Sequence, residues 1–89
     1  MPDLRDRADM LALAGDFESA IPLLRELIAA APAEAALARK LAAALDATGA
    51  VEEAVACYRR ALTLDPADAR AHDELGRLLG RRGDMPGAP

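Results

Sequence analysis

The chain has 89 residues, of which 53% are hydrophobic, and a formal net charge of −4. This length supports one small domain, residues 1–89, with a thin stability margin. The acidic balance argues against non-specific nucleic-acid binding, which needs a basic surface, and no apolar run approaches the roughly 18 residues of a membrane span. We therefore expect no nucleic-acid and no membrane partner. The first residues lack the layout of a signal peptide, so a cytoplasmic location is expected.

The N-terminal part of the chain predicts two helices. The first carries Leu4, Ala8 and Leu11 at helical spacing. Gly15 and Asp16 follow, as a turn residue and the cap of the next helix. The apolar face of that second helix is formed by Ile21, Leu24, Leu27 and Ile28. Pro22 lies inside this helix, where it removes one backbone hydrogen bond.

The middle of the chain repeats this plan. One helical face is formed by Leu37, Leu41, Ala44 and Leu45. Gly49 then supplies the left-handed conformation that ends a helix. The next helix carries an apolar face of Ala54, Val55, Tyr58, Ala61 and Leu62. Asp65-Pro66 ends it, and Asp68 is placed to cap the helix that follows.

The last predicted helix runs from about Ala69 to Arg82, and Gly83 and Asp84 make the expected turn. Landmark residues recur every 34 positions along the whole chain. They are Gly15, Gly49 and Gly83; Ala20, Ala54 and Ala88; Pro32 and Pro66; and Leu11, Leu45 and Leu79. We therefore predict repeat units at residues 1–34 and 35–68, with a partial unit at 69–89.

The repeat resembles that of the tetratricopeptide family, whose 34-residue unit is a helix–turn–helix. The second unit carries the resemblance with Ala38, Leu41, Ala42, Leu45, Gly49, Ala54, Tyr58, Ala61 and Pro66. Arg7 departs from the usual leucine, so the first helix is expected to pack less well. The resemblance implies an all-α fold, a right-handed α-solenoid of about 2.5 units and five helices. It also implies that the first helix of each unit lines a concave side where partners bind.

By this resemblance the chain is a scaffold that binds a peptide or helix of another protein on its concave face. The residues implied for that face are Arg5, Asp6, Asp9, Ala12, Leu13, Arg39, Lys40, Ala43, Asp46, Ala47, Arg70, Asp73, Glu74, Arg77 and Arg81. One branch of the family clamps carboxylates with basic and amide residues. Here Asp9 and Glu74 stand at two of those positions and would repel a carboxylate, so the full clamp is not expected.

The partial third unit suggests an alternative function, which is self-assembly. The last helix carries Leu75, Leu78 and Leu79 on one face. Each leucine side chain left exposed to water loses roughly 1.5–3 kcal/mol of stabilisation from burial. Three arrangements are open at this stage. The polar remainder of the helix acts as a cap, two chains pair as a homodimer, or the chain is a piece of a longer array.

The sequence gives little support to catalysis, metal binding or a cofactor. His72 is the only histidine, and it stands at the family's tryptophan position, which favours a packing role. Cys57, the only cysteine, has no histidine placed to activate it and is expected to be a buried structural thiol. Glycines 76, 80 and 83 lack the strand and the Gly-Lys-Ser/Thr of a phosphate-binding loop. We expect no enzyme, no cofactor and no catalytic or metal-binding residues.

Overall fold

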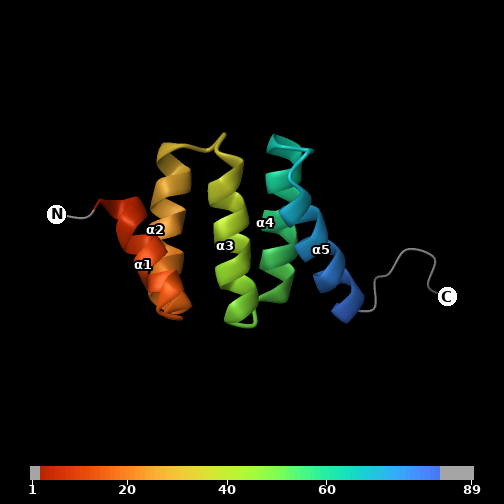
Figure 1. Ribbon diagram of the computed structural model, residues 1–89, viewed down its shortest axis with the longest axis horizontal. Helices are drawn as coiled ribbons and strands as arrows, with labels where there is room; N and C mark the ends of the chain where they lie inside the picture. The colour runs from red at the N-terminus through yellow and green to blue at the C-terminus, as the bar shows by residue number, and fades with distance from the viewer. Residues whose placement is uncertain (1–2, 83–89) are drawn as a thin grey trace.

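The computed structural model describes residues 3–82 and shows an all-α fold. Its five helices are α1 (Leu4–Leu13), α2 (Phe17–Ala30), α3 (Ala35–Ala47), α4 (Val51–Leu64) and α5 (Ala69–Arg82). Each helix packs against the next one along the chain, so the helices form a row of neighbours (Figure 1). The predicted fold class is confirmed, and α2 continues across Pro22. The predicted turn at Gly83 and Asp84 lies outside the described residues.

The turns inside the two helix pairs have the same hydrogen bonds because both need a left-handed residue. Gly15 has φ 81° and Gly49 has φ 89°. After α3, the Ala50 N–H donates to the Leu45 carbonyl at 2.9 Å and the Gly49 N–H donates to the Asp46 carbonyl at 3.1 Å. This pattern satisfies carbonyls at the helix end that would otherwise lack partners. The glycines predicted from the repeat are therefore confirmed as helix-ending residues.

Aspartates cap three of the helices. Asp3 accepts from the Asp6 N–H at 2.9 Å, Asp16 from the Ser19 N–H at 3.3 Å, and Asp68 from the Ala71 N–H at 3.1 Å. Each cap satisfies one free N–H in the first turn of α1, α2 or α5. The caps predicted at Asp16 and Asp68 are confirmed.

Alanines dominate the positions where helices lie closest. Ala20, Ala42 and Ala54 have no exposed surface and Ala8 has 1%. Because a methyl group is the smallest side chain that still contributes apolar surface, alanine allows two helix axes to approach closely. The row of helices is therefore held by small residues at the contacts, with leucines filling the spaces between them.

Tyr58 on α4 is the largest fully buried side chain of the described core. Burial disfavours the charged phenolate and raises the pKa of Tyr58 to about 12. The same core cluster contains buried residues of α3 and α5, among them Leu37 and Leu78. Tyr58 therefore belongs to the packing that joins α4 to the helices on either side of it.

One face of α5 is less covered than the matching face of α3. Ala38, Leu41, Ala42 and Leu45 are all buried on α3. The residues 34 positions later are His72, Leu75, Gly76 and Leu79. Of these, His72 and Gly76 are exposed, and Leu75 and Leu79 are half-buried.

The predicted packing role of His72 is wrong. Its ring is exposed, and its Nε2 atom lies 2.9 Å from the Pro66 carbonyl oxygen as a hydrogen-bond partner. The physical reason is that α4 covers the matching residue of α3, whereas no helix among residues 3–82 covers this side of α5. Leu78 also differs from its expected role, because it is fully buried within the chain and has no exposed surface to contribute to self-association.

We expect Tyr58→Ala to lower the free energy of unfolding by about 3–5 kcal/mol, because the cavity would loosen the contacts of α4 with its neighbours. Urea denaturation followed by circular dichroism would measure the change. Tyr58→Phe is the control, since it keeps the ring volume and should cost much less. Equal losses for the two variants would contradict a packing role for the ring.

Candidate functional site

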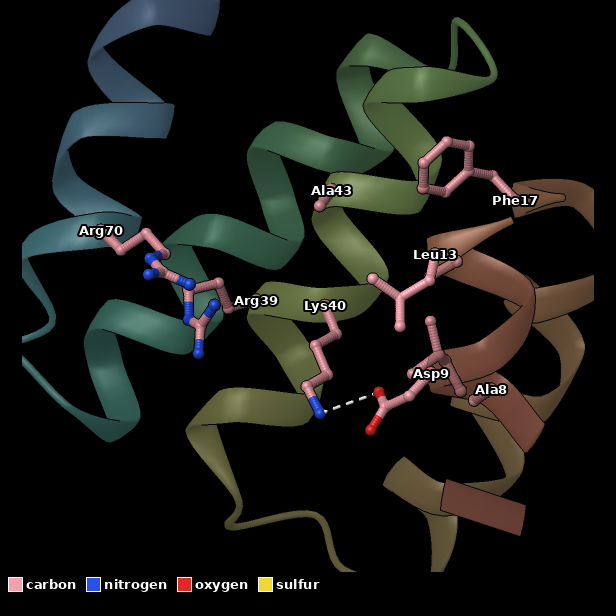
Figure 2. A pocket seen from close by; sticks show the side chains of 10 residues that line it. Ala8, Asp9, Leu13, Phe17, Arg39, Lys40, Ala43 and Arg70 are labelled. Carbon is pink, nitrogen blue, oxygen red and sulfur yellow. Dashed lines mark hydrogen bonds and ion pairs between the residues drawn. The ribbon is translucent and has the colours of Figure 1, made fainter. Parts of the chain in front are cut away.

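A groove opens between α1, α3 and α5, with the start of α2 at one end. Its volume is about 380 Å³. The lining residues are Ala8, Asp9, Ala12, Leu13, Phe17, Leu24, Arg39, Lys40, Ala43 and Arg70. Figure 2 shows Leu13 and Phe17 toward one end of the groove and Arg39 and Arg70 toward the other. The groove is therefore apolar near α1 and α2 and cationic near α5.

The apolar end contains an exposed leucine. Leu13 is 89% exposed, and the half-buried ring of Phe17 lines the same groove. Leu24 lies deeper and is 2% exposed. An apolar group placed on Leu13 and Phe17 would remove carbon surface from water at a stabilisation of about 25 cal/mol per Å². This end is therefore an apolar surface on which a side chain of a ligand could pack.

Most charges along the concave side are already paired. Lys40 Nζ lies 3.0 Å from Asp9 Oδ1 (Figure 2), and Arg39 Nε lies 3.2 Å from Asp68 Oδ2. The Arg70 side chain forms no hydrogen bond or ion pair with any other residue between 3 and 82. The groove therefore keeps one uncompensated positive charge, at its α5 end.

The Arg39–Asp68 pair also shapes the groove. Asp68 uses Oδ1 to cap α5 and Oδ2 to accept from Arg39. One carboxylate therefore fixes the first turn of α5 against α3. The matching pair one repeat earlier joins Arg5 of α1 to Glu34, where both guanidinium Nη atoms donate to the carboxylate. These recurrent pairs link successive groove-lining helices at the same point of each repeat.

The structure separates the predicted concave residues into two groups. Asp9, Arg39, Lys40 and Arg70 line the groove, together with the predicted Ala12, Leu13 and Ala43. The other predicted residues do not line it. Arg5 pairs with Glu34, and four of the predicted residues pair with one another, Asp46 with Arg81 and Arg77 with Glu74. Asp6, Ala47 and Asp73 are exposed outside the groove. Pairing alone does not separate the two groups, because Arg39 and Lys40 are ion-paired and still line the groove.

Three groove residues were not among the predicted concave residues: Ala8, Phe17 and Leu24. Phe17 is the aromatic one among them. It belongs to the second helix of its unit, whereas the resemblance places binding residues on first helices. Its signal was present in the composition, because it is one of only two aromatic residues. The other, Tyr58, is buried.

Other kinds of site find little support among the described residues. Cys57 is a half-buried free thiol whose pKa is raised by burial, which makes it a weaker nucleophile. Among residues 3–82, no three His, Cys, Asp or Glu side chains are grouped to hold a metal ion. No helix in this range is long and apolar enough to cross a membrane.

Comparisons with known proteins agree with this architecture. A family model described as a tetratricopeptide repeat matches residues 11–87. The chain belongs to the tetratricopeptide repeat family. A relative in this family is the TPR repeat-containing thioredoxin TTL4 of Arabidopsis thaliana, at 33% identity over 86 residues. This alignment covers 97% of the present chain but only 13% of that protein, so the thioredoxin in its name describes that protein alone.

Two solved structures have the same arrangement of helices. They are MamA residues 41 to the end from Desulfovibrio magneticus RS-1, with a TM-score of 0.87, and a MamA RS-1 double mutant, with a TM-score of 0.88. Each is 28% identical in sequence, and the match covers 91% of this chain and 46% of the other. The chain thus spans less than half of these proteins. The fold and family are those of a protein–protein interaction or assembly module, and such repeats are typically non-catalytic scaffolds.

The Arg5–Glu34 pair gives a measurable electrostatic signature. The hydrogen bond from Arg5 holds the pKa of Glu34 below its usual range. Because the folded-state pKa is lowered, the stabilisation is present above the unfolded pKa and is lost as pH falls through the folded value. We expect Arg5→Gln to raise the pKa of Glu34 toward its ordinary value, as measured by NMR titration of its side-chain carboxyl carbon.

The control for this titration is Arg7→Gln, which removes an exposed arginine of α1 that makes no ion pair with any residue in 3–82. It should leave the Glu34 titration nearly unchanged. If both variants shift the Glu34 pKa equally, the effect is a general change of charge and not the specific pair.

Proposed function

We propose that this chain binds a short segment of a partner protein in the groove between α1, α3 and α5. An apolar side chain of the segment rests on Leu13 and Phe17, and an acidic group pairs with Arg70. The observation that carries this proposal is that one groove holds both an 89% exposed leucine and an arginine whose side chain has no partner among the described residues. A ligand that meets both features gains apolar burial and a charge-assisted hydrogen bond.

The paired charges define what the groove would reject. Lys40 is neutralised by Asp9, and Arg39 is neutralised by Asp68. A segment with several carboxylates would have to displace these pairs or lie against Asp9. The groove therefore favours one acidic group at a fixed distance from an apolar residue over a densely acidic tail.

Self-assembly remains a second candidate because one face of α5 is open. Its apolar contributors are Leu75 and Leu79, which are half-buried, and not Leu78. The centre of this face lies on a different side of α5 from Arg70. Gly76 comes six positions after Arg70, and at about 100° per residue the two residues point about 120° apart around the helix axis. The two functions therefore centre on different sides of α5.

Peptide display on the immobilised chain provides the test, with random seven-residue peptides as the probe. We expect enrichment of peptides that carry one acidic residue at a constant spacing from a leucine, phenylalanine or similar side chain. Arg70→Glu should lower the affinity of the chain for the selected peptides by roughly tenfold or more, since a hydrogen bond to a charged group contributes about 1.5–3 kcal/mol. Fluorescence anisotropy would measure each affinity.

Arg59→Glu is the matched control. Arg59 is an exposed arginine of α4 that is outside the groove and whose side chain has no ion pair with residues 3–82. This variant should bind as the wild type does. Leu13→Ser should also weaken binding while leaving the thermal midpoint nearly unchanged, because the side chain is 89% exposed. Peptides that bind all variants equally would contradict the groove as the site.

A further inference from the structure

The open face of α5 is defined by comparison within the molecule. His72, Leu75, Gly76 and Leu79 stand 34 positions after four residues of α3 that are buried. These α3 residues lie on the helix that packs on α4. Among residues 3–82 no helix follows α5, so the matching face has no cover. This face of α5 therefore carries the same repeat positions that α3 uses to pack on α4, but no helix among residues 3–82 packs on it.

Gly76 makes this face unusually accessible to another backbone. It stands at the position of Ala8 and Ala42, which are 1% and 0% exposed. A Cβ atom added at Gly76 would meet nothing within 4 Å. Within the described chain nothing requires a glycine at this point of the helix, where glycine costs helix propensity. A close crossing with a second helix is a physical reason for a residue without a side chain.

The charges beside this face are self-complementary. Asp73 lies in the N-terminal half of α5 and makes no ion pair with another described residue. Arg77 lies one turn later on the same edge of the helix, exposed, and its only described partner is Glu74 of its own helix. Along this edge the acidic Asp73 comes before the basic Arg77. A second α5 that runs in the opposite direction therefore places its Arg77 next to Asp73 of the first.

We propose that two copies of this chain associate through α5, with the two helices antiparallel and crossing at Gly76. In this arrangement His72 of each chain faces Gly80 of the other, where a residue without a side chain leaves room for the ring. Leu75 and Leu79 of both chains meet along one edge of the contact. Along the opposite edge, Asp73 of each chain lies within reach of Arg77 of the other, since the two differ by only about 3 Å in height along the helix axis.

A second copy fits this face better than an unrelated helix does. In a symmetric interface one surface must complement itself, and here the acidic and basic residues exchange places under the two-fold operation. Gly76 lies between the leucine edge and the charged edge, where two identical helices would approach most closely. Arg70 lies about 20° farther around α5 than Arg77 and takes no part in this contact. The proposal therefore does not depend on peptide binding.

The first experiment measures the mass of the whole chain by sedimentation equilibrium over a wide concentration range. We expect a reversible monomer–dimer equilibrium. Gly76→Glu should weaken it roughly tenfold or more, because a long charged side chain would block the crossing. Its helical circular dichroism should stay unchanged, because a Cβ atom at this position meets no neighbour within the chain. Ala56→Glu on the exposed side of α4 is the control with the same added charge, and it should dimerise as the wild type does.

Several outcomes overturn the proposal. A wild-type chain that stays monomeric at every concentration has no such dimer, and a helix of another molecule or of a longer chain would then be the occupant of this face. A dimer that Gly76→Glu leaves intact uses another surface. A dimer that Ala56→Glu weakens as strongly as Gly76→Glu responds to net charge and not to the crossing.

The second experiment exchanges the charges. Asp73→Arg alone, or Arg77→Asp alone, places two like charges next to each other at both symmetry-related contacts of the dimer. Each variant should therefore dimerise with an affinity roughly tenfold or more below that of the wild type. Mixing the two variants should restore association as heterodimers. In the heterodimer the introduced arginine of one chain faces the introduced aspartate of the other, and the remaining native Arg77 faces the remaining native Asp73. Every contact along this edge is then again between opposite charges.

Tagging one of the two charge variants and measuring co-purification and mass detects the heterodimer. The wild-type chain, tagged and mixed with its untagged form, gives the reference level of exchange. A mixture of the variants that associates no better than its components would refute the antiparallel register.

Discussion

The structure depends on close contact between neighbouring helices at alanine positions. Ala8, Ala20, Ala42 and Ala54 are almost completely buried, and each helix packs mainly on its neighbours in the row. In such a stack, stability is approximately the sum of each unit's own stability and its contacts with the next. A helix inside the row gains two neighbours, whereas a helix at either end of residues 3–82 gains one.

The two end helices show this constraint directly. Met10 of α1 is 61% exposed, whereas the residues at the same repeat position in α3 and α5, Ala44 and Leu78, are 2% and 0% exposed. At the other end, His72 and Gly76 are exposed where the matching residues of α3 are buried. The same packing rule therefore explains both the buried interior of the row and the exposed residues on the two end helices of the described chain.

Charge pairing between helices determines which polar side chains of the concave side are free to meet a ligand. The concave side carries several cations, but carboxylates of neighbouring helices neutralise most of them. These exposed or half-exposed pairs contribute little each to stability, yet they fix how the side chains are directed. The Arg70 side chain remains without a partner among the described residues, and this is why we place the ligand's acidic group there.

The sequence predicted the helices, the glycine turns, the aspartate caps and the family, because these depend on local spacing and on a period of 34 residues. It did not reveal that Arg5 and Arg77 are paired, since pairing depends on which side chains lie side by side in the folded chain. It placed His72 in a packed position by analogy with a unit that has both helices. Phe17 was missed because it lies outside the family's usual set. The partner, the cytoplasmic location and the division into units stay predictions.

Amide hydrogen exchange measured residue by residue, at low and at high protein concentration, tests the central claim that packing between neighbours sets local stability and leaves α5 open. We expect the slowest exchange in α3 and α4 at low concentration. The amides from His72 to Leu79 should exchange faster and should gain protection as concentration rises. If α5 is as protected as α3 at low concentration, or if its exchange does not change with concentration, the open face and its pairing are contradicted.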